Sequence, residues 1–160
     1  MALVNLVVDY FPCFRDEAVF HGERVNFYKR AQILVGDLWA CFNGESFGLF
    51  DDIDSISMFA DYRIPQMLES LGCLWYSPQL KYRIKRLDHF RPGEDAEIEL
   101  RGCSIWCVEL LRREIVKAHP ETKVNAILID FFLYDTLKEK ESNGEEAEML
   151  PHHRTRSIWY

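Results

Sequence analysis

Two carboxylates lie in a segment that is otherwise strongly apolar. Asp130 and Asp135 fall within Lys123–Glu141, where hydrophobic residues cover almost every side of a predicted helix. A helix that is apolar all round is expected to be buried, and burial of an unpaired carboxylate raises its pKa. Acids of this kind are typical of functional sites, although structural ion pairs and helix caps also bury them. Both acids are therefore candidate site residues, and Asp130 can reach Tyr134 one turn later.

A third acid, Asp61, follows a phenylalanine in the segment Ile56–Arg63. The Phe59 ring offers a stacking face for a planar ring. The two oxygens of Asp61 can together accept hydrogen bonds from a ring N–H and an exocyclic amine. The alternative is a core phenylalanine beside an aspartate that pairs with Arg63.

Arg101 precedes a helix-like run, Ile105–Val116, together with Gly102 and Ser104. Glycine permits close backbone approach, and Ser104 is a candidate N-cap for the run. The guanidinium of Arg101 can bind a carboxylate or a phosphate as a fork. Arg101 is therefore a candidate ligand-binding residue, and a structural arginine that holds a buried acid is the alternative.

A compact cationic segment near the end of the sequence contains His153, Arg154 and Arg156. A basic tail is usually solvated. This one is followed by Ser157–Tyr160, which is too apolar to remain in water. We therefore predict that the tail docks and brings its basic residues against the body of the protein.

Helical periodicity dominates the elements that must position these residues. The predicted helices cover residues 26–42, 65–72, 78–86, 98–116 and 123–141. Asn43-Gly44 ends the first of them, and Ser77-Pro78 supplies an N-cap and first-turn proline for the third. Residues 97–100 alternate in polarity and could be extended. The sequence predicts a mainly α protein with one domain over residues 1–160.

The composition limits the class of partner. The chain has 160 residues, 19 Lys and Arg against 26 Asp and Glu, a net charge of −7, and 48% hydrophobic residues. The apolar fraction excludes intrinsic disorder, and the acidic balance argues against binding along a nucleic acid. No apolar run approaches the roughly 18 residues of a membrane helix. We predict no membrane partner. A ligand with a single phosphate stays possible, because one phosphate needs only two or three local donors.

The five cysteines form no CxxC pair, so they indicate reduced thiols in the cytoplasm and no metal site. Cys103 and Cys107 are four residues apart and could share a helix face, and we expect this pair to be buried as small hydrophobic side chains. No motif in the chain predicts a cofactor.

Several long segments, in order, resemble the queuosine salvage protein family. They are Arg24–Gln32, Met58–Gln66, Glu99–Glu109, Ile127–Asp135 and His153–Arg156. The resemblance covers nearly the whole chain and corresponds to the C-terminal half of a typical family member, as in a truncated form, a splice form or a fragment. It implies a mainly helical fold similar to helix-hairpin-helix DNA glycosylases.

The resemblance also implies an activity, the hydrolysis of the N-glycosidic bond of queuosine 5′-monophosphate to queuine and ribose 5-phosphate. In that reaction Asp130 would be the nucleophile or transition-state stabiliser, because glycosidic cleavage develops positive charge at the anomeric carbon. Phe59 and Asp61 would bind the base, and Asp135 and Tyr134 would add polar contacts. The phosphate candidates are Arg101, His153, Arg154 and Arg156.

Two other interpretations stay open at this point. An inactive isoform could bind queuine or a protein partner without turnover. The other is a nucleic-acid glycosylase that acts on a flipped base, and the acidic composition argues against this interpretation.

Overall fold

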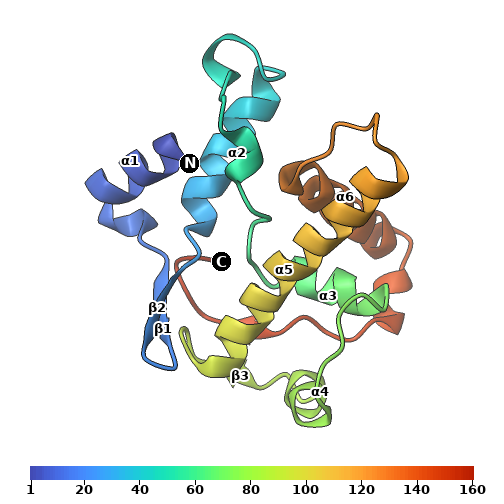
Figure 1. Ribbon diagram of the computed structural model, residues 1–160. Coiled ribbons are helices and arrows are strands. Elements are labelled where there is room, and N and C mark those ends of the chain that lie inside the picture. The colour runs from blue at the N-terminus through green and yellow to red at the C-terminus, as the bar shows by residue number, and fades with distance from the viewer.

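The computed structural model describes residues 1–160, and most of its regular structure is helical, which confirms the predicted mainly α class (Figure 1). The helices are α1 (Ala2–Tyr10), α2 (Lys29–Cys41), α3 (Arg63–Ser70), α4 (Pro78–Lys85), α5 (Asp95–Ala118) and α6 (Ala126–Ser142). The strands are β1 (Glu17–Phe20), β2 (Glu23–Asn26), β3 (His89–Phe90) and β4 (Arg154–Thr155). Short 3₁₀ turns lie at Pro12–Phe14, Ser46–Gly48, Ile53–Ser55 and Glu145–Glu148. None of the helices has the length and hydropathy needed to cross a membrane.

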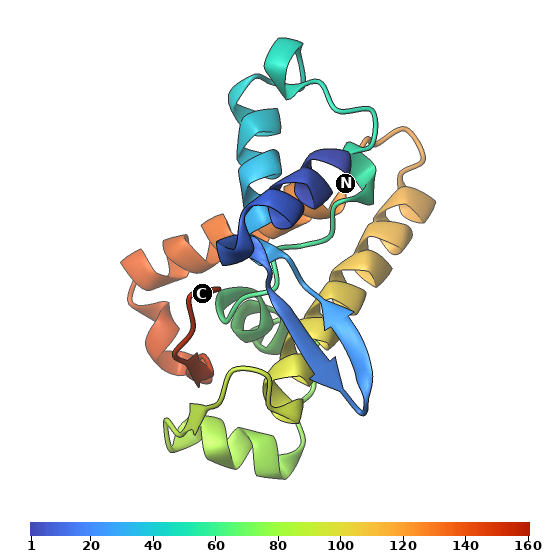
Figure 2. The ribbon, with the colours of Figure 1, turned by 90° about the vertical axis from the view of Figure 1, so that its left-hand side faces the viewer.

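The N-cap and first-turn proline predicted at Ser77-Pro78 are confirmed at the start of α4. The Ser77 hydroxyl accepts a hydrogen bond from the backbone N–H of Leu80 at 3.2 Å, as an N-cap does. By contrast, α2 begins three residues later than predicted. Residues 23–26 instead form β2, which pairs antiparallel with β1 as a hairpin (Figure 2).

One long helix, α5, contains residues 97–100, for which the sequence suggested an extended conformation, and Ser104, for which it suggested an N-cap. Residues 97–100 are helical, and Ser104 lies in the middle of the helix, where its hydroxyl donates to the carbonyl of Leu100 at 2.6 Å. The predicted N-cap at Ser104 is therefore wrong. The buried face of this helix follows helical spacing and includes Glu97, Arg101, Ser104 and Val108. Because two of these residues are charged, the face does not stand out as apolar in the sequence.

Helix α6 lies between two parts of the core. Ile129 and Leu133 belong to a cluster with α3 and α5, whereas Ile127 belongs to a cluster with α1 and α2. Asp130 comes between these residues in the sequence and is buried with them. The helix therefore holds this carboxyl at the junction of the two clusters.

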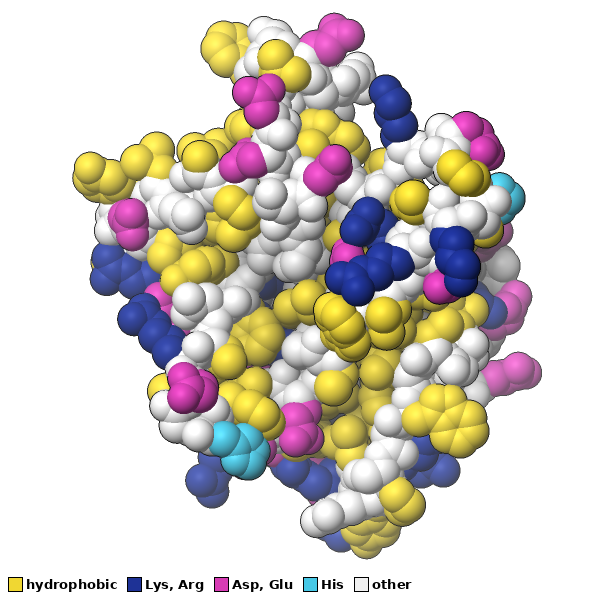
Figure 3. All heavy atoms as spheres, viewed as in Figure 1, with side chains coloured by type: hydrophobic (Ala, Val, Ile, Leu, Met, Phe, Trp, Pro, Cys, Tyr) yellow, Lys and Arg dark blue, Asp and Glu magenta, His cyan; other side chains and the backbone are white.

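The outer side of α6 is apolar but not buried. Leu128 is 39% exposed and Phe132 is 67% exposed, so the expectation that the helix is buried all round is wrong. These two residues line a hollow of about 300 Å³ whose nine lining residues are all hydrophobic. Trp106 and Leu110 of α5 are also exposed, and Figure 3 shows a band of hydrophobic side chains across the middle of one face.

The predicted docking of the tail is confirmed, but Arg154 and Arg156 are not brought against the body and stay exposed. Strand β4 pairs in parallel with β3, with His89 opposite Arg154 and Phe90 opposite Thr155. The chain then returns to the middle of the molecule, and both ribbon views show its end there (Figures 1 and 2). Cys103 is exposed and Cys107 is half-buried, so the expectation that this pair is buried is wrong.

Candidate active site

A cavity of about 340 Å³ lies where α2, α3, α6 and the end of the chain meet. Four of the predicted site residues line it, namely Phe59, Asp61, Asp130 and Tyr134. The other lining residues are Lys29, Ile33, Asp37, Tyr62, Arg63, Phe131, Lys138 and Tyr160. The cavity therefore combines aromatic rings with charges of both signs.

Two helices each present one face to this cavity. Lys29, Ile33 and Asp37 follow at four-residue intervals in α2, and Asp130, Tyr134 and Lys138 do so in α6. The sequence itself carries a pattern that marks these two faces. In each helix a cation and an acid lie eight residues apart on the same face, which spans about 12 Å along the axis.

Asp130 has the environment that the sequence predicted for a buried acid. The residue is only 5% exposed, and its Oδ2 accepts a hydrogen bond from the backbone N–H of Phe59 at 2.8 Å. Burial raises the pKa of Asp130 from 3.8 to about 7; the Phe59 N–H opposes this shift, nearby Asp61 adds to it and Lys29 opposes it. Near neutral pH this carboxyl can therefore exist in both protonation states.

This raised pKa makes the stability of the fold depend on pH. Between about pH 4 and pH 7 the unfolded chain has lost the Asp130 proton while the folded chain retains it. The free energy of unfolding should therefore fall as the pH rises across this window and become independent of Asp130 above it. Asp130→Asn lacks this titration, so its stability advantage over the wild type should grow from pH 4 to pH 7. Urea unfolding of both proteins at several pH values measures this difference, and a constant difference would contradict it.

Phe59 is both a core residue and a wall of the cavity. Its ring is 5% exposed and lies 6.1 Å from the ring of Phe131, centroid to centroid. It reaches α2 at Gly36, where an added Cβ would come within 2.7 Å of the Phe59 Cζ. The two interpretations that the sequence left open, core residue and binding residue, are thus compatible at this position.

Gly36→Ala tests this contact. The added methyl group should displace the Phe59 ring and lower the free energy of unfolding by about 1–3 kcal/mol, as overpacking does. Gly102→Ala in α5 is the matched control, because nothing lies within 4 Å of its added Cβ. That change should raise stability by about 0.5–1 kcal/mol through helix propensity. Equal effects in thermal unfolding would show that Gly36 is not packed as described.

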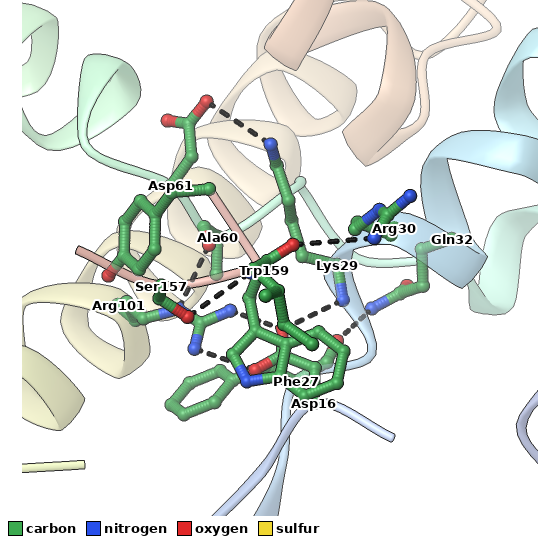
Figure 4. A network of polar contacts seen from close by, with 12 residues as sticks. Asp16, Phe27, Lys29, Arg30, Gln32, Ala60, Asp61, Arg101, Ser157 and Trp159 are labelled. Atoms are coloured by element: carbon green, nitrogen blue, oxygen red, sulfur yellow. Dashed lines mark hydrogen bonds and ion pairs between the residues drawn. The ribbon is translucent and has the colours of Figure 1, made fainter. Parts of the chain in front are cut away.

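Asp61 is fixed at the start of α3. Its Oδ1 accepts hydrogen bonds from the backbone N–H groups of Arg63 and Ile64, at 2.8 and 3.1 Å. Its Oδ2 lies 3.9 Å from Nζ of Lys29, and Figure 4 shows the two side chains pointing toward each other. The alternative pairing with the Arg63 side chain is wrong, because that guanidinium pairs with Glu141 and Glu146.

Arg101 does not line the cavity. It is 2% exposed, and its guanidinium binds both oxygens of Asp16, at 2.9 and 2.5 Å (Figure 4). Its Nε donates to the carbonyl of Ala60, between Phe59 and Asp61, at 2.9 Å. The predicted ligand-binding role is therefore wrong and the structural alternative is confirmed. Arg101 therefore supports the site from behind, by holding the segment that carries Phe59 and Asp61.

The predicted phosphate residues of the tail also lie outside the cavity. His153 is 3% exposed, and its burial lowers its pKa to about 3, so it is neutral at physiological pH. Arg154 and Arg156 are exposed. The tail docks through β4 and the Tyr160 hydroxyl, which leaves these guanidinium groups in solvent.

Asp135 is exposed as well and does not line the cavity, so its predicted burial is wrong. The buried face of α6 follows Ala126, Asp130, Leu133 and Leu137. Asp135 instead shares the partly exposed side of the helix with Leu128.

The positive charges of the cavity come from residues that sequence reasoning did not select. They are Lys29, Arg63 and Lys138. Arg63 and Lys138 both pair with Glu141, at 2.7 and 2.6 Å, whereas Lys29 faces Asp61 more loosely. Asp37 at the other end of the α2 face is exposed. No group of three or more His, Cys, Asp and Glu side chains is placed to hold a metal ion.

The fold and the cavity define a mainly helical protein with a buried acid in a cavity lined by aromatic and charged side chains. The sequence matches the family described as "Queuosine salvage protein" over residues 1–160, and the chain belongs to this family. Among its relatives is the queuosine 5′-phosphate N-glycosylase/hydrolase of Mus musculus, 45% identical over 99% of this chain and 47% of the mouse protein. Proteins of the same name from Schizosaccharomyces pombe and Sphaerobacter thermophilus are 47% and 44% identical, over 99% and 100% of this chain. The chain spans about half the length of these relatives, 46% and 47% of the latter two.

Proposed function

We propose that this chain hydrolyses the N-glycosidic bond of queuosine 5′-monophosphate and so releases queuine for salvage into tRNA modification. The observation that carries the proposal is the Asp130 carboxyl, buried in an aromatic cavity with a pKa of about 7. Family membership and the names of the relatives supply the substrate and the reaction class.

In this reaction the bond between the anomeric carbon and the base nitrogen breaks, and its electron pair leaves with the base. The ionised Asp130 stabilises the oxocarbenium-like transition state or attacks the anomeric carbon, and water then supplies a hydroxyl to the sugar and a proton to the base. The leaving base is a 7-deazapurine, which has carbon in place of N7. Protonation at N7 is therefore unavailable, and help for the leaving group must come from hydrogen bonds to its other polar edges.

The remaining lining residues suit the other parts of this substrate. The Phe59 ring stacks on the base, Oδ2 of Asp61 accepts a hydrogen bond from its edge, and Tyr134 adds a polar contact. Oδ1 of Asp61 is already occupied by the two backbone N–H groups at the start of α3. The base carries an aminomethyl cyclopentenediol arm that is cationic at neutral pH, and the acids of the cavity favour that charge. Lys29, Arg63 and Lys138 are the cations within reach of the 5′-phosphate.

Three further proposals accompany this function. We propose that residues 1–160 form one domain, related in fold to the helix-hairpin-helix DNA glycosylases. The net charge of −7 supports a mononucleotide substrate and no direct nucleic-acid partner. The five free thiols favour the cytoplasm, where they stay reduced.

The test is incubation of the 160-residue chain with queuosine 5′-monophosphate, with free queuine and ribose 5-phosphate measured by mass spectrometry. Guanosine 5′-monophosphate, which lacks the cationic arm, is the matched substrate control. We expect equimolar release of the two products from the first nucleotide and none from the second. A folded chain that binds queuine without releasing it from the nucleotide would contradict the proposal and favour an inactive isoform.

A further inference from the structure

The last residues of the chain cross the candidate active site as a strap. The strap, residues 154–160, begins at β4, which pairs with β3. It is then held at α2, where Nη1 of Arg30 donates to the carbonyl of Ile158 at 3.4 Å. Figure 4 shows Ser157 and Trp159 of this segment lying in front of Lys29 and Arg101. The strap thus reaches the cavity from outside and ends in it at Tyr160.

The Tyr160 hydroxyl is anchored in the protein interior. It donates to Oε1 of Glu97 in α5 at 2.5 Å and lies 3.3 Å from Nε2 of His153. Glu97 is only 2% exposed, and the same Oε1 lies 3.5 Å from Nη1 of Arg101. Burial and the neighbouring Glu97 raise the pKa of Tyr160, which keeps its hydroxyl protonated as a donor. A buried carboxylate is costly unless it is paired, so Glu97 holds this hydroxyl strongly.

The ring of Tyr160 is positioned as firmly as its hydroxyl. It stacks on Tyr62, with the centroids 5.9 Å apart and the planes 24° apart. The guanidinium of Arg101 lies 5.3 Å from the ring centroid. The ring lines the candidate cavity and also an adjoining hollow of about 370 Å³ beside α2. With its hydroxyl turned inward, Tyr160 presents an aromatic surface to the ligand from a different element than Phe59.

We propose that Tyr160 contacts the substrate base through its ring and that Glu97 and Arg101 are positioning residues for that ring. The inference rests on the proposed function, which supplies a planar base as the ligand. It adds an aromatic wall carried by the C-terminal strap, held in place by two buried charged side chains that never reach the ligand. Aromatic stacking of a base depends on the position of the ring, so loss of the anchor should weaken the binding of the base specifically.

The ligand experiment compares two fragments of the substrate on the full 160-residue chain. Calorimetry measures the Kd of queuine and, separately, of ribose 5-phosphate. Tyr160→Ala should raise the Kd of queuine by about tenfold or more and leave that of ribose 5-phosphate within about twofold. Tyr160→Phe retains the ring, so its Kd for queuine should lie between those of the wild type and Tyr160→Ala. Tyr10→Ala is the control, because Tyr10 is 74% exposed and outside the cavity.

The positioning role has its own readout, the deuterium uptake of the strap amides. Glu97→Met removes the acceptor and should raise both this uptake and the Kd of queuine. Glu97→Gln keeps an acceptor oxygen, so both values should stay close to those of the wild type. In a Tyr160→Phe background, Glu97→Met should add nothing to the Kd of queuine, because the anchoring hydroxyl is already absent. If Glu97→Met raises the Kd of queuine by the same factor in the Tyr160→Phe background as in the wild type, the positioning role is overturned.

The remaining outcomes separate this inference from the proposed function. If Tyr160→Ala weakens both fragments equally, or neither, while the wild type still releases queuine from the nucleotide, the contact is overturned and the function stands. If the wild type binds neither fragment and releases no queuine, the proposed function fails and the contact fails with it.

Discussion

Asp130→Asn should abolish the release of queuine from queuosine 5′-monophosphate while lowering the affinity for queuine only modestly. Asparagine keeps the shape of the side chain and an oxygen that can accept the 2.8 Å hydrogen bond from the Phe59 N–H. It cannot ionise, so it neither attacks the anomeric carbon nor neutralises the charge that develops there. We expect kcat to fall by at least about 10³-fold, the scale of losing a main transition-state contact.

The control for this variant is Asp135→Asn. It removes the same charge from the same helix, five residues further along, at an exposed position outside the cavity. Its activity should match that of the wild type. The kcat/KM of the wild type should also rise with pH through about 7, because only the ionised Asp130 is active. Substantial turnover by Asp130→Asn, or a larger loss in Asp135→Asn, would contradict the assignment.

Arg101→Met should be the most destabilising single change at the ion pair beneath the site. Methionine preserves the apolar stem of arginine, but it leaves Asp16, which is 1% exposed, as a buried carboxylate without its partner. Breaking a buried pair in this way costs about 3–5 kcal/mol. The change also frees the Ala60 carbonyl, so the segment with Phe59 and Asp61 should loosen.

Urea unfolding measures this loss. Arg113→Met is the matched control, since Arg113 lies in the same helix, pairs with Glu109 and is 54% exposed. Its effect should stay below about 1 kcal/mol, as for most surface pairs. Replacing both partners, in Asp16→Asn with Arg101→Met, should recover part of the stability because no unpaired charge remains. A loss no larger than that of Arg113→Met would show that the buried pair is not stabilising.

Patterns within one helix or one short segment predicted much of this fold and the centre of the site. The apolar periodicity around Asp130 placed a carboxyl where only a functional or paired acid could persist. The aromatic–acid spacing of Phe59 and Asp61 likewise identified two lining residues, and the apolar end of the tail predicted its docking. In each case the deciding contact is local, or the burial of the segment follows from its own composition.

The parts that were not predicted depend on partners far away in the sequence. Arg101 and Asp16 are 85 positions apart, and nothing near either one marks it as half of an ion pair. The cations Lys29 and Lys138 stand in different helices and acquire a common role only when α2 packs against α6. His153 carries no local sign of the burial that removes its charge.

Because Asp130 titrates near pH 7, the heat measured when a ligand binds should depend on the buffer. Near pH 7 the free protein is a mixture of protonated and ionised forms at this carboxyl. A cationic ligand in the cavity favours the ionised form, so binding expels a fraction of a proton into the solvent. The apparent enthalpy then includes the heat with which the buffer takes up that proton. Titrations in phosphate and in Tris should differ in enthalpy for the wild type and agree for Asp130→Asn.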